Sequence, residues 1–231
     1  MNFLLLSILV ICFISVCAAA IYFYFSSKKE GICIKLPSPF KEGNISLEEA
    51  ISLRRSSRDF DESFISLKTV SQILWAAQGV NDKGGFRTAP SAGATYPLEI
   101  YLIAGLVSGL DAGVYKFKIK LHQLEKVKVG DLRPELSSLC SSKISVFNAS
   151  VSLIICGVYE RTVWKYTDKG KMYVDMEVGS ASENIYLQAV TLNLGTVFIG
   201  DFDEVGVKKL LNIQNEEVPL CIMPIGKVKI S

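Results

Sequence analysis

Residues 151–159 form a nearly continuous apolar run, Val-Ser-Leu-Ile-Ile-Cys-Gly-Val-Tyr. A strand of this composition is typical of one that is covered on both faces of its sheet. A chain of 231 residues, 49% of them hydrophobic, can supply that cover from a single core. The run therefore predicts one globular domain in which helices pack around one sheet.

The elements expected around this strand do not alternate regularly. Ser46 and Glu49 form a capping box that opens a helix through about Arg54, and a second helix is expected between Ser66 and Gly79. The remaining pattern predicts strands at 99–104, 114–119, 122–128, 196–202 and 220–228, and helices at 131–140, 173–194 and 205–211. This order predicts an α+β fold, with helices around a mostly antiparallel sheet, rather than a doubly wound one.

The first part of the chain contains no charged residue between positions 3 and 25, and this length matches the ~20 apolar residues that cross a bilayer. Tyr22 and Tyr24 lie near its end, and Lys28 and Lys29 follow, which favours a cytoplasmic globular part. We therefore expect a transmembrane anchor at 1–27, a linker at 28–44 and a domain at 45–231.

Two alternatives to the anchor follow from the same segment. The small residues at 18–20 could end a cleaved signal peptide, although no lysine or arginine precedes the apolar run. Lipid modification of Cys17 is the second alternative. The anchor reading predicts a single-pass membrane protein whose domain lies on the cytoplasmic side.

Charge and cysteine content exclude other classes. The chain has 25 basic and 23 acidic residues, without a stripe of one sign, which argues against nucleic acid as a partner. The six cysteines show no zinc-ligand or redox spacing, so we predict no metal site and interpret them as structural thiols. The single histidine, His122, lies in an expected hairpin and is also interpreted as structural.

An arginine cluster is the first candidate for binding. Arg54, Arg55 and Arg58 lie within five positions at a helix end, with Ser56 between them. Two guanidinium groups can converge on one anion, and their planar forks suit phosphate oxygens. The alternative is a solvated basic helix end, which the helix dipole favours.

A loop of small residues is the second candidate. In Pro90, Ser91, Ala92 and Gly93, short side chains allow backbone N–H groups to approach a ring or a phosphate. A tight turn is the alternative. Because the chain has neither a Gly-x-Gly-x-x-Gly after a strand nor a Walker-type lysine, a mononucleotide cofactor fits better than a dinucleotide or a nucleoside triphosphate.

Several separated motifs together resemble the flavin-dependent nitroreductase superfamily, and more narrowly its SagB-type dehydrogenase branch. The likeness covers nearly everything after about residue 45. It rests on Arg54-Arg55-Ser56-x-Arg58-x-Phe60, Leu74-Trp75-Ala76-Ala77-Gln78-Gly79, Arg87-Thr88-Ala89-Pro90-Ser91-Ala92-Gly93-Ala94, Arg161-x-x-Trp164-Lys165-Tyr166, Glu177-x-Gly179, Asn184-x-Tyr186 and Gly195-Thr196-Val197-x-Ile199-Gly200.

The resemblance implies a domain that binds FMN non-covalently, usually at a homodimer interface, and passes hydride equivalents through it, with NADH or NADPH as a candidate electron donor. By position, it implies that the phosphate and ribityl chain are held by Arg54, Arg55, Ser56 and Arg58, with Lys227 adding positive charge. It implies that the flavin is lined by Pro90, Ser91, Ala92 and Gly93. Ile199 and Gly200 would close against the ring, with a backbone N–H aimed at the flavin.

The resemblance also implies a catalytic pair. Lys165 and Tyr166 match a lysine and a tyrosine that azoline-oxidising members use near the substrate. A lysine in a desolvated pocket has a lowered pKa and can accept a proton as hydride leaves for the flavin. Tyr166 could donate a hydrogen bond or relay the proton. The alternative is a surface turn in which the lysine lies over aromatic rings.

The sequence departs from the family pattern at Ser180, where a histidine is frequent, and at Glu183, where a glutamine is frequent. The chain also ends at Ser231, without a long arm to embrace a partner subunit. We expect an FMN-dependent oxidoreductase acting on an unidentified small molecule or peptide, with azoline oxidation as one candidate reaction. The alternative is a membrane-tethered flavin-binding module without turnover that acts in a modification complex.

Overall fold

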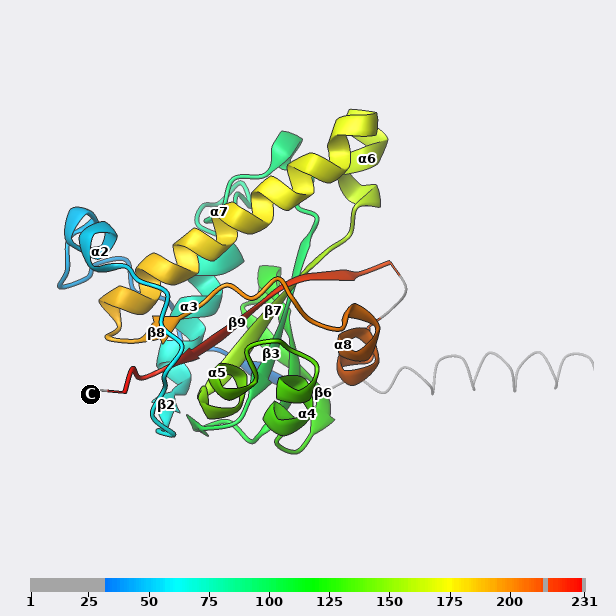
Figure 1. Cartoon of the computed structure of the whole chain (residues 1–231). Helices are drawn as coiled ribbons and strands as arrows, with labels where there is room; N and C mark the ends of the chain where they lie inside the picture. Colours follow the sequence, from blue (N-terminus) through cyan, green and yellow to red (C-terminus); the bar gives the residue numbers. More distant parts are fainter. Residues whose placement is uncertain (1–31, 214–215, 230–231) are drawn as a thin grey trace, which may run out of the picture. The chain divides into compact units, whose positions relative to one another are not determined.

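The computed structural model describes residues 32–213 and 216–229 (Figure 1). Strand β7 (Val151–Gly157) pairs with β3 (Leu98–Ala104) on one side and with β9 (Val218–Gly226) on the other. All seven residues of β7 are buried. The prediction of a strand covered on both faces is confirmed.

The main sheet has seven strands. Its order is β1 (Cys33–Lys35), β6 (Gln123–Val129), β5 (Gly113–Lys118), β3, β7, β9 and β8 (Gly195–Thr196), and every neighbouring pair is antiparallel. A separate parallel pair joins β2 (Ile65–Ser66) to β4 (Val107–Ser108). The predicted α+β fold with a mostly antiparallel sheet is confirmed, and β1 adds an edge strand inside the segment 28–44 that we interpreted as a linker.

Helices cover both faces of this sheet. One face carries α3 (Leu67–Gln78) and α7 (Gly170–Thr191), and the other carries α4 (Arg133–Ser138), α5 (Lys143–Asn148) and α8 (Glu204–Leu211). Side chains alternate along a strand, so the two faces of the sheet have separate hydrophobic cores. Ile100 and Leu102 of β3 point to the first core, under α3 and α7, whereas Tyr101 and Ile103 point to the second core, under α4, α5 and α8.

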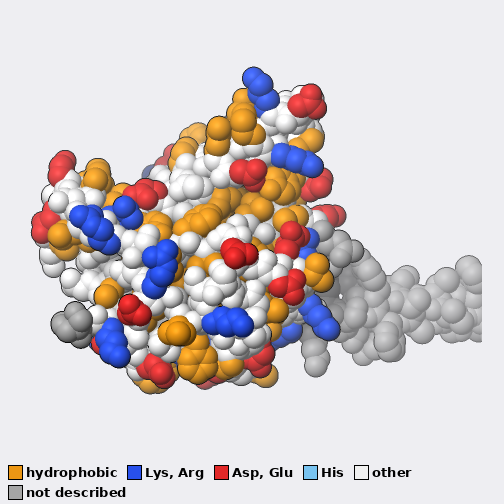
Figure 2. Space-filling model, in the orientation of Figure 1, with side chains coloured by type: hydrophobic (Ala, Val, Ile, Leu, Met, Phe, Trp, Pro, Cys, Tyr) orange, Lys and Arg blue, Asp and Glu red, His pale blue; other side chains and the backbone are white. Residues whose placement is uncertain are grey.

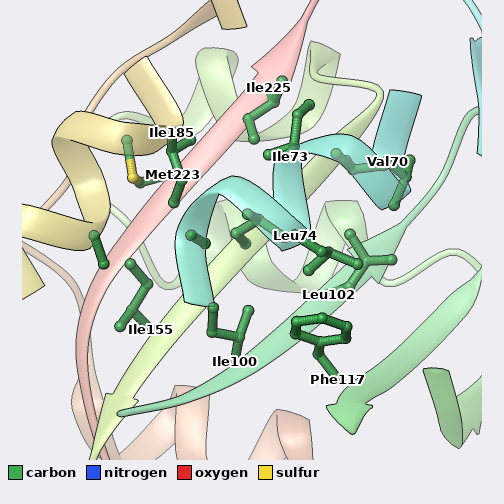
Figure 3. Packing of buried hydrophobic residues seen from close by; sticks show 14 of the residues in the cluster. Val70, Ile73, Leu74, Ile100, Leu102, Phe117, Ile155, Ile185, Met223 and Ile225 are labelled. Atoms are coloured by element: carbon green, nitrogen blue, oxygen red, sulfur yellow. The ribbon is translucent and has the colours of Figure 1, made fainter. Parts of the chain in front are cut away.

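Figure 3 shows the first core, in which Val70, Ile73 and Leu74 of α3 lie against the sheet. Their neighbours come from strands far apart in the sequence, including Ile100, Leu102, Phe117, Ile155, Met223 and Ile225. Burying each such side chain contributes roughly 1.5–3 kcal/mol. The sheet is therefore held mainly by contacts between residues that are distant in the sequence.

The first two helices begin as the sequence predicts. The Ser46 hydroxyl accepts the backbone N–H of Glu49 at 3.1 Å at the start of α2 (Leu47–Leu53). The Ser66 hydroxyl accepts the N–H of Thr69 at 3.1 Å at the start of α3. These caps satisfy donors that have no partner within the helix.

Two elements differ from their prediction. The helix expected at 131–140 is shortened to α4, and α5, at 143–148, is a separate helix that was not predicted. The hydroxyls of Ser137 and Ser138 bond to backbone carbonyls three residues earlier, which competes with continued helix. The strand expected at 196–202 is reduced to β8. The N–H of Phe198 donates to the Tyr186 hydroxyl at 2.7 Å, and this bond takes it out of the sheet ladder.

The membrane prediction needs a correction. The helices found at 32–213 and 216–229 include none that is long and apolar enough to span a bilayer. We therefore withdraw the predicted single-pass, membrane-anchored localisation. The apolar segment 3–25 on which it was based lies outside the described residues.

Candidate functional site

The segment that leaves α2 is held between β8 and the end of β9. The N–H of Ser57 donates to the carbonyl of Thr196 at 2.9 Å. Further along, the N–H of Asp61 donates to the carbonyl of Lys227 at 2.9 Å, and Phe60 bridges Val228. Three segments that are distant in the sequence thus converge, and they place Lys227, one residue past β9, opposite Asp61, three residues beyond Arg58 in the sequence.

The cations of this region have few counter-charges. Arg54 lies 5.3 Å from the centre of the Tyr186 ring, and its Nε is 3.9 Å from Glu183 Oε1. Arg55 donates from Nη1 to the carbonyls of Ser52 and Arg54, so it folds back on the end of α2. Arg58 and Lys227 are exposed and form no ion pair with the described residues. The cluster is therefore a positive surface that suits an anion.

Tyr186 of α7 connects this cluster to the segment after β8. Its hydroxyl lies 3.2 Å from Ser56 Oγ and accepts the N–H of Phe198 at 2.7 Å. The side chain is buried. The sequence motif contains this tyrosine, but its position alone assigned it no role; the structure shows that it holds two of the three converging segments together.

The loop of small residues has an unusual backbone. Gly93, Ala94 and Tyr96 all have positive φ, at 57°, 54° and 48°. The Ser91 hydroxyl accepts the N–H of Tyr96 at 2.9 Å and closes the turn. Pro90 and Gly93 are exposed. Left-handed backbone costs roughly 1–2 kcal/mol at a residue other than glycine, so the surrounding structure must hold this loop in place.

Helix α6 (Glu160–Tyr166), which the sequence did not predict, packs against the loop. Lys165 Nζ donates to the carbonyl of Gly93 at 3.2 Å. A Cβ on Gly93 would lie 2.5 Å from both Lys165 Nζ and Tyr166 Oη. The positive φ favours glycine at this position, and a larger residue would also displace the ends of the Lys165 and Tyr166 side chains, which lie directly against the loop.

Two further contacts fasten α6. Thr162 Oγ1 lies 2.8 Å from Thr95 Oγ1, and Arg161 Nη1 donates to the carbonyl of Tyr96 at 3.2 Å. Lys165 itself is exposed. The desolvated pocket that the sequence interpretation assumed around this lysine is not formed by the described residues.

Glu177 of α7 lies beneath the loop. It is 4% exposed, and its Oε1 has no hydrogen-bond partner among the described residues. Burial raises the pKa of Glu177 to about 7, although Ser91, Arg87 and Gln78 oppose this rise. Acids with such a pKa are frequent at functional sites. Sequence reasoning missed this residue because a shifted pKa depends on tertiary burial.

Both groups of residues meet α7, the arginine cluster at Tyr186 and the loop at Glu177. Nine residues separate these two positions, which is about 13 Å along the helix axis. The site is therefore elongated, with a cationic end and an end made of exposed loop backbone.

The contacts of Ile199 limit which N–H of this segment could be directed at a ring. Ile199 exchanges both backbone hydrogen bonds with Ile222, at 2.9 and 3.0 Å, and its side chain lies in the second core. Its N–H therefore has a partner already and is not free to point at a ring. Gly200 is exposed. At Ser180, where the sequence departs from the family pattern, Oγ donates to the carbonyl of Met176, one turn earlier in α7.

Comparison with known proteins agrees with this fold. The model of the nitroreductase family matches residues 51–227, which is more than half of the chain. The chain therefore belongs to the nitroreductase family, whose members are oxidoreductases.

Individual relatives narrow the assignment. A protein of Methanocaldococcus jannaschii that bears a nitroreductase name is 42% identical over 79% of this chain and 91% of its own length. The microcin B17-processing protein McbC of Escherichia coli is 27% identical over 73% of this chain, which spans 64% of that relative. The chain falls in the SagB-like branch of the superfamily.

Solved structures give the same result. A structure from Ralstonia eutropha in the nitroreductase group has a TM-score of 0.75 at 26% identity, covering 88% of this chain and 92% of that one. A chain of the E. coli microcin synthetase McbBCD complex, with truncated pro-MccB17 bound, has a TM-score of 0.69 at 25% identity. The match covers 89% of this chain and 80% of that one.

Proposed function

We propose that this oxidoreductase depends on FMN and transfers hydride equivalents between the flavin and a small molecule or peptide. The observation that supports the proposal is that the arginine cluster and the strained small-residue loop both meet helix α7, the cluster at Tyr186 and the loop at Glu177. A flavin mononucleotide has the matching chemistry, a phosphate at one end and a flat ring at the other. When bound, FMN supplies the hydride chemistry.

The residues present fit such a cofactor. Arg54, Arg58 and Lys227 provide cationic donors for the phosphate, of which only Arg54 has an ion pair with a described residue, at 3.9 Å. Ser56 adds a hydroxyl beside them. Pro90 and Gly93 are exposed and leave backbone accessible to a flat ring.

Lys165 and Tyr166 are the proposed proton-handling groups. Lys165 Nζ bonds to the carbonyl of Gly93, so the pair lies at the end of the site where the ring is proposed to bind. Lys165 would hold or accept a proton at Nζ, and Tyr166 would donate a hydrogen bond from its hydroxyl. Relatives that process microcin B17 and trifolitoxin support a peptide substrate, with azoline oxidation as a candidate reaction.

Flavin binding is tested first, by titrating the purified full chain with FMN and following flavin fluorescence and absorbance. We expect saturable binding that weakens by more than tenfold in Arg54→Ala/Arg58→Ala, because each charge-assisted hydrogen bond contributes roughly 1.5–3 kcal/mol. Lys143→Ala, an exposed lysine at the start of α5, is the control. Equal affinity in the double variant and the control would place the phosphate elsewhere.

Turnover is tested by stopped-flow reduction of the FMN-loaded chain with NADH and NADPH, followed by reoxidation with a nitroaromatic compound or a quinone. In a second arm an azoline-containing peptide replaces NAD(P)H as the hydride donor, and we expect Lys165→Ala to keep the FMN affinity of the wild type and to lose most of this azoline-oxidising turnover. A Lys165→Ala variant with wild-type turnover would rule out the lysine as the proton acceptor.

The second candidate function is a flavin-binding module without turnover that acts within a modification complex. Two observations favour it: Ser180 replaces a histidine of the family and bonds to its own helix, and Lys165 is exposed. The McbBCD complex supports a multi-protein assembly for the relative. If the bound flavin is neither reduced by NAD(P)H nor reoxidised by an acceptor, this second function replaces the first.

We further propose a homodimer. Large apolar side chains are exposed on α2 (Leu47 60%, Ile51 57%), on α7 (Met176 60%) and at Phe198 (41%). Figure 2 shows hydrophobic side chains gathered along the line of α7 on this face. Exposed apolar groups of this kind favour a subunit interface, and a partner subunit there would also exclude water from the neighbourhood of Lys165.

A further inference from the structure

Arg87 is a half-buried cation without an ion pair. Its Nη1 donates to Gln78 Oε1 at 3.0 Å and to the carbonyl of Leu98 at 3.5 Å, and its Cζ lies 4.5 Å from the centre of the Tyr96 ring. Among the described residues, no carboxylate lies within 4.0 Å of the guanidinium, and Nε and Nη2 have no hydrogen-bond partner. Burial lowers the pKa of Arg87, although the carboxylates of Glu99 and Glu177 oppose this shift from beyond ion-pair distance.

This arginine lines a groove of about 660 Å³ between the loop before β3, the end of β5 and the start of α6. Its charged lining consists of Arg87, Lys116, Lys118, Lys120, Arg161 and Glu99. The apolar part includes Tyr96 and Phe117. Grooves of ~300–1,000 Å³ that combine apolar walls with a few polar groups are typical of ligand sites.

The carboxylates near this groove are already engaged. Glu99 Oε1 is 2.7 Å from Arg161 Nη2, and Glu99 Oε2 is 3.5 Å from Lys116 Nζ. Lys116 also pairs with Glu217 at 2.5 Å, and Lys118 pairs with Glu125 at 3.0 Å. Of the lining cations, Arg87 and the exposed Lys120 are the two without an ion pair to any described residue. The groove therefore retains uncompensated positive charge.

We propose that this groove binds the anionic group, a carboxylate or a phosphate, of a ligand. Arg87 is the principal contact, because its Nε and Nη2 form a planar fork that matches two oxygens of such a group. Lys120 adds a point charge at the rim. The aromatic ring of Tyr96, already stacked on the guanidinium, gives the ligand an apolar wall.

The position of the groove relates it to the candidate site. Arg87 precedes the loop at 90–94 by three residues, and Arg161 belongs to α6, which also carries Lys165 and Tyr166. An anion bound at Arg87 would thus be held beside the loop and the catalytic pair. The proposed anion site does not require bound FMN, because the groove is lined by side chains of this chain alone.

The test is isothermal titration calorimetry on the full chain without added FMN, at low ionic strength. The probes are inorganic phosphate and N-acetyl-triglutamate amide. We expect saturable binding of at least one probe, weakened roughly tenfold by Arg87→Gln and severalfold by Lys120→Glu, as expected when a charge-assisted hydrogen bond or a nearby charge is lost. Lys143→Glu makes the same change in net charge away from the groove and should bind like the wild type.

Each outcome supports or overturns the inference. Tighter binding of phosphate assigns a phosphorylated ligand, and tighter binding of the peptide assigns a ligand with carboxylate side chains. Failure of the wild type to bind either probe overturns the inference, as does an equal loss in Lys143→Glu. If circular dichroism shows that Arg87→Gln is unfolded, the test rests on the comparison of probe affinity between Lys120→Glu and the wild type.

A final arm separates this groove from the proposed flavin site. The Lys120→Glu and Lys143→Glu variants are titrated with FMN, and we expect equal affinities. A selective loss in Lys120→Glu would assign the groove to the flavin phosphate and overturn a separate site. Failure of the anion probes would leave the proposed FMN-dependent function untouched, because that function is tested at Arg54 and Arg58.

Discussion

The buried carboxyl of Glu177 predicts a specific dependence of stability on pH. Its pKa is about 7 in the folded chain, against an ordinary value of 4.5. A raised pKa in an acid means that the folded state binds a proton more tightly than the unfolded state does. Each pKa unit corresponds to about 1.4 kcal/mol, so the difference corresponds to about 3 kcal/mol.

The direction of this pH dependence follows from the protonation state of the Glu177 carboxyl in the folded and the unfolded chain. Below pH 4.5 the carboxyl is neutral in both states, and its stabilising contribution is fully present. Between pH 4.5 and 7 the unfolded state ionises while the folded state does not, so the free energy of unfolding falls by about 3 kcal/mol. Above pH 7 both states are ionised and the contribution stays lost. Glu177→Gln is neutral throughout and should lack this fall.

The assay is urea unfolding of the full chain at pH values from 4 to 8, followed by tryptophan fluorescence. The difference in unfolding free energy between Glu177→Gln and the wild type should rise by about 3 kcal/mol across the window, since other titrating groups cancel. Glu135→Gln, an exposed carboxylate at α4, is the matched control. A difference curve that varies by less than about 0.5 kcal/mol, the size of an ordinary surface effect, would refute the buried acid.

Three further changes test the site and the interface. Gly93→Ala should lower the unfolding free energy by more than 1 kcal/mol in urea, because it adds a strained φ and a Cβ 2.5 Å from Lys165 Nζ; an unchanged midpoint would contradict the packing. Tyr186→Phe should cost roughly 1–3 kcal/mol in the same assay by leaving its partners unpaired; an unchanged midpoint would contradict the link that its hydroxyl makes. Ile51→Asp should halve the mass measured by light scattering, whereas Val205→Asp, at a residue that is even more exposed, should not; a monomeric wild type would exclude the homodimer.

The fold could be predicted largely from local patterns. The apolar run at β7 and the hairpin of β5 and β6 each reveal their strand through their own residues. The caps at Ser46 and Ser66 likewise act within four residues. Helix α6 escaped prediction because its fixing contacts, Thr162 with Thr95 and Arg161 with Tyr96, come from a distant loop.

The candidate site likewise has a part that could be predicted from contiguous motifs and a part that depends on tertiary packing. The arginine cluster and the small-residue loop were found from motifs, since both are contiguous in the sequence. The buried state of Glu177 and the links made by Tyr186 arise only when α7 packs on the sheet. That the N–H of Ile199 bonds to Ile222, 23 residues later, could likewise not be read from the sequence, and the contact of this segment with a ring stays a prediction.

The pairing of β7 with β9 also has a consequence for synthesis of the protein. Val151 pairs with Ile225, and the segment past β9 completes the cation cluster at Lys227. A nascent chain therefore exposes one edge of its most apolar strand until almost the last described residue has left the ribosome. Such a chain folds late and is open to aggregation in the interval. We infer that the contacts of the segment past β9, among them the bond from Asp61 to Lys227, are among the last of the described contacts to form.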